Sequence, residues 1–376
     1  MSKFDRYMLS QLMMLFGFFA LVLVSVYWIN RAVSLFDQLI SDGQSAWVFL
    51  EFTALTLPNV IRLVLPVAAF VASVYVTNRL ASESELVVMM ATGFSPFRLA
   101  RPVVYFGLVV TLMVAILAHV LVPASRTKLA ERRGEIAENV ASRFLTEGTF
   151  LHPASGITFY IRAISPQGEL EDIFLTDART PGRRTTYTAE RALLVKSDTG
   201  PKLVMFEGMA QTLATATAAL SVTRFADFSY DLGALIGGAA GRLPSVEELP
   251  TPVLLAASAD SAAAYGTTEA AMLLEGHERI ARPFLALVSA LIGFATLLTG
   301  GFSRFGLWRQ IALSVVLLVF VQFLANGATS LVARSSAAWP AIYLPVVAGL
   351  AIAAGALALA GRARRVHHGL VAAVAS

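Results

Sequence analysis

The sequence contains no cysteine and few charged residues for its length. None of the 376 residues is cysteine, which excludes disulfide scaffolds, thiolate zinc sites and cysteine nucleophiles. Charged side chains make up 14% of the chain, whereas a soluble globular protein carries about 25%. Hydrophobic residues make up 56%, and the mean hydropathy is +0.68. The chain therefore has too little polar surface for a water-facing body and is too apolar to be disordered, which indicates a membrane protein.

Motifs that would support catalysis are also missing from the sequence. There is no Gly-x-x-x-x-Gly-Lys-Ser/Thr phosphate-binding loop, so we expect any ATP hydrolysis to belong to another subunit. No serine stands in a nucleophile elbow with histidine and aspartate partners, and the five histidines lack metal-ligand spacing. We therefore predict no catalytic residue, no metal site and no cofactor. The net charge of +4 first suggests basic loops on one side of a membrane, and only second nucleic acid.

Six uncharged runs are long enough, or nearly so, to cross a membrane. A helix needs about 20 apolar residues to span about 30 Å of hydrocarbon. The runs lie at 7–30, 63–78, 102–123, 283–303, 310–333 and 335–361. The second run is short, but it spans easily when it starts at Phe52, with Pro58 and Pro66 as kinks. We interpret the first run as a retained helix, because it is too long for a signal peptide and no cleavage site follows it.

Lysine and arginine residues in the short loops predict the orientation of these helices. The side with both termini receives most of them: Lys3, Arg6, Arg79, Arg98, Arg101, Arg304, Arg309, Arg362, Arg364 and Arg365. The opposite side receives only Arg31 and Arg334, with Arg62 nearby. Because basic loops stay in the cytoplasm, we predict cytoplasmic N- and C-termini. The long segment between helices three and four is then outside.

After residue 143, the sequence of this outer segment favours β-strands. Short strand-like runs lie at 156–162, 170–176, 184–187, 192–196, 202–206 and 219–228, with Gly- and Pro-containing turns between them. Strands of this length and spacing predict an antiparallel sandwich, jelly roll or open barrel. Residues 233–266 are rich in Gly, Ala, Ser and Pro, which is typical of a linker.

A further helix is predicted after the linker. Thr267 or Thr268 caps it, and we expect Arg279 and Arg282 to close it before Pro283 opens the fourth span. The predicted fold class is an α-helical polytopic membrane protein with six transmembrane helices and an inserted, jelly-roll-like antiparallel β domain. Its parts are helices one to three at 1–123, the β domain and linker at 124–277, helices four to six at 278–361, and a basic cytoplasmic tail at 362–376.

The cytoplasmic loop between helices two and three predicts a short helix at 83–92. Ser82 and Glu85 have the spacing of a capping box, and Gly93 suits the left-handed residue after a helix end. The apolar residues in the middle of this helix allow two interpretations. It either lies at the bilayer interface and joins two spans, or it is a coupling helix that docks in a groove of a separate ATPase. The candidate coupling residues are Glu83, Glu85, Leu86, Val88, Met89, Met90 and Gly93.

Two arginines near the outer ends of spans are candidate substrate ligands. Arg31 ends the first span, and Arg62 lies toward the outer part of the second. A charge near hydrocarbon commonly extends to the interface as an anchor. The functional alternative is binding of a phosphorylated lipid head group, for which a planar guanidinium is well shaped.

The loop and several shorter segments, taken together, resemble one known family. Residues 84–95, Ser-Glu-Leu-Val-Val-Met-Met-Ala-Thr-Gly-Phe-Ser, are similar to the coupling segment of the lipopolysaccharide-export permeases of the LptF/LptG type. Further matches, in order along nearly the whole chain, are Phe4-Asp-Arg-Tyr7, Asn30-Arg31, Glu147-Gly-Thr-Phe150, Asp172-Ile-Phe-Leu175 and Glu278-Arg-Ile-Ala-Arg-Pro283. The segments Ser82-Glu-Ser-Glu85 and 172–175 favour the LptF type.

The resemblance implies a multi-pass protein of the cell inner membrane with its β domain in the periplasm. Its implied partners are a second permease of the same family in a heterodimer, a dimeric cytoplasmic ATPase and a membrane-anchored periplasmic bridge protein. Its implied substrate is lipopolysaccharide, which would leave the outer leaflet and pass along the jelly-roll domains to the bridge. The resemblance also places Arg31 at a basic position of the family.

Two other functions are compatible with the same helices. A permease of another ATP-driven lipid, lipoprotein or drug exporter is one, but such subunits place a large outer domain between the first two of four helices. A membrane scaffold that displays a β domain is the other, but it would have no use for an apolar helix in the cytoplasmic loop.

Overall fold

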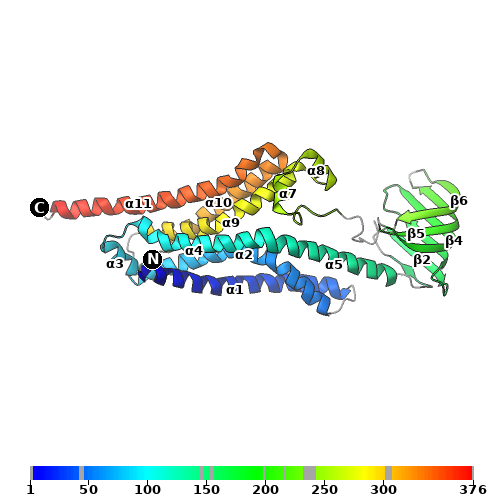
Figure 1. Cartoon of the computed structure of the whole chain (residues 1–376), viewed down its shortest axis with the longest axis horizontal. Coiled ribbons are helices and arrows are strands. Elements are labelled where there is room, and N and C mark those ends of the chain that lie inside the picture. Colours follow the sequence, from blue (N-terminus) through cyan, green and yellow to red (C-terminus); the bar gives the residue numbers. More distant parts are fainter. Residues whose placement is uncertain are drawn as a thin grey trace. The chain divides into compact units, whose positions relative to one another are not determined.

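The computed structural model describes residues 3–41, 46–143, 147–152, 156–197, 200–215, 217–231, 243–300 and 307–374. The chain forms two compact units (Figure 1). We call Met1–Arg126 with Pro244–Ser376 the helical unit, and Thr127–Leu243 the β unit.

Six long apolar helices in the described part of the chain have the length and composition to cross a membrane, which confirms the predicted number of spans. The first three are built from α1 (Lys3–Ser41), α2 (Ala46–Ser82), and α4 (Pro96–Ile116) continued by the π-helical turn η1 (Leu117–Leu121) into α5 (Val122–Arg143). The last three are built from α9 (Glu269–Leu298), α10 (Trp308–Arg334), and the 3-10 helix η2 (Ser336–Tyr343) with α11 (Leu344–Val374). The predicted tail at 362–376 begins inside α11, and its side chains beyond residue 362 lie outside the described residues, as does Arg304.

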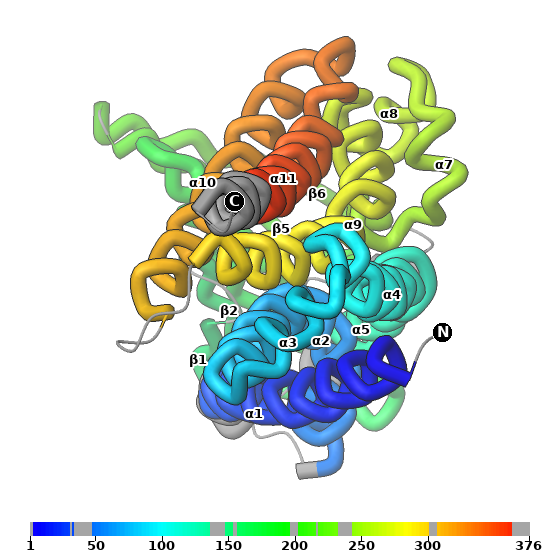
Figure 2. The backbone as a smooth tube through the Cα atoms, turned by 90° about the vertical axis from the view of Figure 1, so that its left-hand side faces the viewer, coloured from blue at the N-terminus to red at the C-terminus, as the bar shows by residue number. Residues whose placement is uncertain are grey.

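Helix α9 is the central element of the helical unit. It packs between α2 and α4 on one side and α10 and α11 on the other (Figure 2). Small residues allow this close approach, because a Cβ atom at Gly107 of α4 would lie 2.5 Å from Leu287 Cδ1. Serines then join α9 to α2: Ser73 Oγ donates to the Ala290 carbonyl oxygen at 2.6 Å, and Ser289 Oγ donates to that of Pro66 at 3.0 Å.

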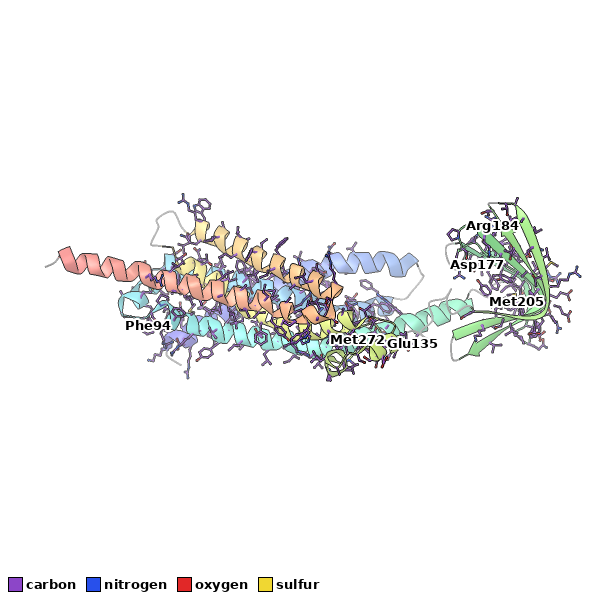
Figure 3. All side chains as sticks on the ribbon, turned by 90° about the horizontal axis from the view of Figure 1, so that it is seen from above. Phe94, Glu135, Asp177, Arg184, Met205 and Met272 are labelled. Atoms are coloured by element: carbon purple, nitrogen blue, oxygen red, sulfur yellow. The ribbon has the colours of Figure 1, made fainter. Side chains whose placement is uncertain are left out.

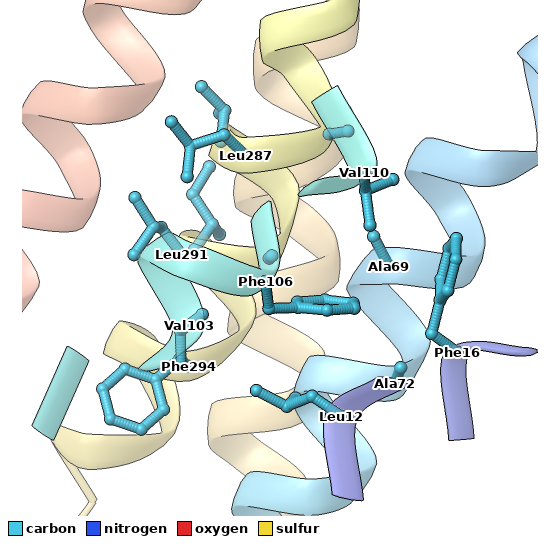
Figure 4. Packing of buried hydrophobic residues seen from close by; sticks show 14 of the residues in the cluster. Leu12, Phe16, Ala69, Ala72, Val103, Phe106, Val110, Leu287, Leu291 and Phe294 are labelled. Atoms are coloured by element: carbon cyan, nitrogen blue, oxygen red, sulfur yellow. The ribbon is translucent and has the colours of Figure 1, made fainter. Parts of the chain in front are cut away.

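The core of the helical unit joins side chains from α1, α2, α4 and α9 (Figure 4). Phe106 of α4 is fully buried at its centre and meets Phe16 of α1 edge to face, with ring centroids 5.6 Å apart. Aromatic pairs in this arrangement stabilise beyond the area that they bury.

One predicted boundary in this unit is wrong. Thr268 caps α9 as predicted, and its side chain accepts a hydrogen bond from the Ala271 amide at 3.2 Å. The helix does not close at Arg282, however, because α9 continues through Pro283 to Leu298. Proline removes one backbone donor, and burial among neighbouring helices tolerates this loss.

The β unit is one antiparallel sheet, which confirms the predicted β domain. Its strands are β1 (Phe150–Leu151), β2 (Ile157–Ile164), β3 (Leu170–Asp177), β4 (Arg183–Ser197), β5 (Gly200–Ala214) and β6 (Ala219–Asp231). Their spatial order, β1-β2-β3-β4-β5-β6, is an up-and-down meander in which every described neighbour is a neighbour in sequence. Short connections explain this order, because they allow only adjacent hairpin pairing.

Strand β4 replaces two strands that the sequence predicted separately at 184–187 and 192–196. The two segments are continuous, because Ala189 and Ala192 are buried and the strand pairs with β5 from Arg183 to Ser197. Met205 of β5 lies in the same core (Figure 3). Tyr187 stacks on Phe228 of β6, with ring centroids 5.2 Å apart.

A polar cluster at the end of β3 joins it to β6. Arg179 Nη2 and the Tyr230 hydroxyl both donate to Asp177 Oδ2, at 2.7 and 2.8 Å. The Arg179 hydrogen bonds lower the pKa of Asp177 from 3.8 to about 2, because they favour the carboxylate over the acid. The cluster therefore stabilises the folded state above the unfolded pKa, and this contribution is lost as the pH falls through about 2.

We expect Asp177→Asn to lower the free energy of unfolding of the β unit by about 1–2 kcal/mol at neutral pH, reduced from the full linkage value because Arg179 is partly exposed. The difference from the wild type should narrow as the pH falls toward 2. Urea unfolding of the full chain in detergent, followed by pulsed hydrogen exchange on peptides from β3, measures it. Asp172→Asn is the matched control, because Asp172 forms an exposed ion pair with Arg162. An equal effect of the two substitutions at neutral pH would contradict the assignment.

Candidate functional sites

The loop between the second and third spans contains the predicted short helix, α3 (Glu85–Ala91). Its end is a Schellman motif, in which the Gly93 amide donates to the Met90 carbonyl and the Phe94 amide donates to that of Met89. Gly93 has φ +93°, so the prediction of a left-handed residue at this position is confirmed. Ser95 then caps α4 and accepts a hydrogen bond from the Arg98 amide at 3.2 Å.

The beginning of α3 differs from the sequence prediction. Ser82 is the last residue of α2, and its hydroxyl donates to the Asn78 carbonyl at 2.9 Å. Ser84 precedes α3 with φ +60°, and its side chain makes no capping hydrogen bond. The predicted capping box is therefore wrong, because the chain reverses at Ser84 and separates Ser82 from the helix. The Glu85 carboxylate is instead available to other partners.

Helix α3 divides the candidate coupling residues between a buried and an exposed face. Leu86 is 2% exposed and belongs to the core of the helical unit, against which Met89, Met90 and Phe94 also pack. Val88 is 59% exposed on the other face. Val87 is exposed beside it, although it is not among the coupling residues predicted from the sequence. The face available to a partner is thus Val87 and Val88, with Glu83 in the preceding turn.

A polar network connects the beginning of α3 to α1. Arg79 Nε donates to Glu83 Oε1 at 3.1 Å, Arg79 Nη1 to Gln11 Oε1 at 3.2 Å, and Arg79 Nη2 to the Tyr7 hydroxyl at 3.3 Å. The Tyr7 hydroxyl donates in turn to Glu85 Oε1 at 3.4 Å. Glu83 and Glu85, which the sequence assigns to an ATPase, are both held by this network.

A second candidate site is a cavity of about 420 Å³ between α2, α4, η1, α9 and α10. Most of its lining is apolar, from Leu63, Val67, Val288, Leu318 and other residues of these helices. Charged side chains also line it: Arg62, Glu275, Glu278, Arg279 and Arg282. An apolar cavity with a few converging polar groups is the usual form of a ligand site.

Four of these charged groups are paired within α9. Arg279 Nε donates to Glu275 Oε1 at 2.8 Å, and Arg282 Nη2 donates to Glu278 Oε1 at 2.8 Å. Glu278 Oε1 also accepts from the Thr329 hydroxyl of α10 at 2.7 Å. The two partners of each pair lie one helical turn apart, so their pairing could be expected from the sequence. Their position at a cavity could not.

Arg62 is the remaining cation of the cavity. Its Nη2 donates to the neutral Asn59 Oδ1 at 3.0 Å, and no carboxylate of the described residues forms an ion pair with it. The cavity therefore presents an excess of positive charge at Arg62. Arg31 lies in α1, but its side chain is outside the described residues, so its predicted role stays a prediction.

A family model and two of the relatives below identify one family. The family model for the lipopolysaccharide export system permease LptF/LptG matches residues 6–359. An uncharacterized protein of Rickettsia prowazekii is 22% identical over 85% of this chain and 89% of its own length. The LptF permease of Escherichia coli is 24% identical over 61% of each chain. The LptG permease of Haemophilus influenzae is 24% identical over 46% of this chain and 48% of its own length. Equal identity to an LptF and an LptG leaves the two types unseparated.

Proposed function

The chain belongs to the family of lipopolysaccharide export permeases LptF/LptG, and from this premise we propose that it is the permease subunit of an ATP-driven transporter that removes lipopolysaccharide from the inner membrane. It is a multi-pass inner-membrane protein, with six apolar helices in the part of the chain that the structure describes. Family membership supports this proposal over the two alternatives, another exporter and a membrane scaffold. We further propose a second permease of the family as its partner.

The proposed orientation follows the basic residues of the short loops. It places both termini and α3 in the cytoplasm and the β unit in the periplasm. The β unit would then receive lipopolysaccharide and pass it to a membrane-anchored bridge protein. On the cytoplasmic side, the exposed Val87 and Val88 of α3 support docking to a dimeric ATPase, since apolar side chains at the centre of an interface contribute most to its stability.

The position of Arg62 is the observation that supports lipopolysaccharide as the substrate. Lipopolysaccharide combines acyl chains with a phosphorylated head group. The cavity matches this combination, because its apolar lining suits acyl chains and the guanidinium of Arg62 has donors to spare for a phosphate. The same proposal assigns a phosphate to Arg31 at the end of the first span.

We expect Arg62→Gln to reduce capture of lipopolysaccharide about tenfold or more, because a hydrogen bond to a charged group contributes about 1.5–3 kcal/mol. A photo-crosslinking residue at Val319, which lines the cavity, reports capture at subsaturating lipid. Arg62→Lys should retain part of the capture, since it keeps the charge but loses the planar fork. Arg334→Gln is the matched control, because Arg334 lies on the same predicted side and outside the cavity. Wild-type crosslinking of Arg62→Gln would leave Arg62 as an interfacial anchor.

A further inference from the structure

The strand pairing of the β unit is interrupted along one row that crosses the sheet from β2 to β6. The registers continue on both sides of this row, but they pass over one position in each strand. These positions, which we call the crease, are Arg162, Asp172, Glu190, Glu207 and Ala226. Asp172 and Glu207 have φ +47° and +52°, a left-handed conformation that is strained for residues other than glycine. The backbone of β3 and β5 therefore changes direction at the crease.

A groove of about 590 Å³ lies along the crease. One of its sides is a row of residues that are paired from strand to strand: Tyr160, Phe174, Thr188, Met209 and Arg224. Paired residues share a face of the sheet, whereas neighbours along a strand point to opposite faces. Phe159 and Ile161, on either side of Tyr160, are buried in the core of the β unit. This row therefore lies on the face opposite the core.

Aromatic rings give the groove an apolar surface. Tyr160 and Phe174 line it, and the ring of Phe150 on β1 lies beside them. The Phe150 ring centroid is 4.7 Å from that of Tyr160 and 6.4 Å from that of Phe174. Phe150 is 62% exposed. Large apolar side chains that gather on a water-facing surface mark an interaction site.

Carboxylates from three neighbouring strands line the groove at the crease: Asp172, Glu190 and Glu207. Like charges on neighbouring strands repel each other, so such a row is unfavourable without partners. Arginines supply two of these partners. Arg162 forms an ion pair with Asp172, and Arg191 Nη2 lies 3.6 Å from Glu207 Oε1.

Glu190 and Arg224 are the charged groups of the groove that a ligand can still engage. Both are exposed, and within the part of the chain that the structure describes neither makes a hydrogen bond or an ion pair. The three carboxylates are balanced by three arginines, at positions 162, 191 and 224. A phosphate or a metal ion would bind to an excess of one sign, which this groove lacks.

The groove matches the chemistry of a sugar. The hydroxyl groups of a sugar donate to carboxylates and accept from guanidinium groups. Its ring C–H groups pack on an aromatic ring, whose face is negative. Strands β4 and β6, which carry Glu190 and Arg224, are two strand spacings or about 10 Å apart. The groove thus has room for more than one sugar ring.

We propose that this groove binds the saccharide portion of lipopolysaccharide. A sugar ring packs on Tyr160 and Phe174, and its hydroxyl groups meet Glu190 and Arg224. The proposal rests on the proposed function, because export brings a lipid that carries a saccharide chain to the β unit. The site lies on the face opposite the apolar core, so it is separate from any acyl-chain site in that core.

Oligosaccharide binding to the full chain in nanodiscs tests the aromatic side of the groove. The probe is lipid-free oligosaccharide released from lipopolysaccharide by mild acid, and saturation-transfer NMR during a titration gives the Kd. We expect Tyr160→Ala to raise the Kd about three- to tenfold, because it removes an aromatic contact. Tyr160→Phe should bind as the wild type does, since it keeps the ring.

Glu190→Gln tests the polar side in the same titration. The Kd should rise about tenfold, because hydrogen bonds to a charged group are stronger than those to a neutral one. Glutamine has nearly the same shape and Glu190 is exposed, so the fold should be unaffected. Glu169→Gln is the matched control, because Glu169 lies in the turn between β2 and β3, outside the groove. It should leave the Kd unchanged.

A photo-crosslinking residue at Thr188, which lines the groove, identifies the occupant in whole-cell membranes. We expect an adduct with lipopolysaccharide, in lower yield when Glu190→Gln is also present. Adducts only with peptidoglycan or only with a protein would overturn the assignment.

The saccharide site and the proposed function fail separately. No oligosaccharide binding by the wild type, or a wild-type Kd in both Tyr160→Ala and Glu190→Gln, would overturn the saccharide site even if the chain supports ATP-dependent release. A chain that binds the oligosaccharide as expected but does not support release would contradict the permease function and leave the saccharide site in place.

Discussion

An Arg279→Met protein is expected to lose the ordered segment that precedes α9. Arg279 is 2% exposed, and its Nη1 and Nη2 donate to the carbonyl oxygens of Leu249 and Glu247 at 2.8 and 2.9 Å. Its Nε is paired with Glu275. Methionine fills a similar volume but leaves the Glu275 carboxylate and two carbonyl groups unpaired. Breaking a buried ion pair in this way costs about 3–5 kcal/mol.

Hydrogen exchange in the full chain measures this effect. The short helices α7 (Thr251–Leu255) and α8 (Ala259–Ala264) should lose protection in Arg279→Met, whereas the centre of α9 should keep it. Arg126→Met is the matched control, because Arg126 contacts the same segment through an exposed ion pair with Glu247. Such pairs contribute about 0–1 kcal/mol. Equal protection in Arg279→Met and the wild type would show that Arg279 does not hold the segment.

The second large effect is expected at the exposed face of α3. Val88→Glu would place a carboxylate where we propose that an apolar side chain enters the ATPase. Burying an unpaired charge costs several kcal/mol, so retention of the ATPase should fall at least a hundredfold. The fold of this chain should be unaffected, because Val88 is exposed.

Retention is measured by co-purification of the ATPase with the chain at defined concentrations. Arg101→Glu is the control, because it changes the charge on the same predicted side by a larger amount and lies outside α3. It should retain the ATPase. If Val88→Glu retains the ATPase as well as the wild type does, the exposed face of α3 is not the docking surface.

Because Glu85 accepts a hydrogen bond from Tyr7 and does not cap α3, a substitution of Glu85 tests this contact as well as docking. The sequence placed this carboxylate either in a helix cap or against a basic residue of an ATPase. The structure replaces the cap by a hydrogen bond from Tyr7, while the pairing with an ATPase stays a prediction. A mild effect of Glu85→Gln and a strong effect of Val88→Glu would assign docking to the apolar face and Glu85 to its contact with Tyr7 on α1.

Features set by composition and local spacing could be predicted from the sequence. The six spans follow from uncharged length, because hydrocarbon excludes charges along each helix. The Schellman motif at Gly93 follows from a single residue that tolerates positive φ. The antiparallel sheet follows from alternating runs and turn residues.

Features set by distant contacts could not be predicted in the same way. Ser82 and Glu85 have the spacing of a capping box, but the box does not form because the chain reverses at Ser84. This reversal depends on how Leu86 enters the core of the helical unit. Glu275, Arg279 and Arg282 look like the polar end of a helix in the sequence. Only the packing of α2 and α10 against α9 turns them into the lining of a cavity.

ATP-dependent release of lipopolysaccharide from proteoliposomes tests the account most directly. The vesicles would contain this chain, a second permease of the family and the ATPase, with an acceptor for lipopolysaccharide outside. We predict release that requires ATP, is lost with Val88→Glu and falls about tenfold with Arg62→Gln. Release that proceeds equally without ATP, or that is the same when this chain is omitted, would contradict the proposal that it is the permease subunit.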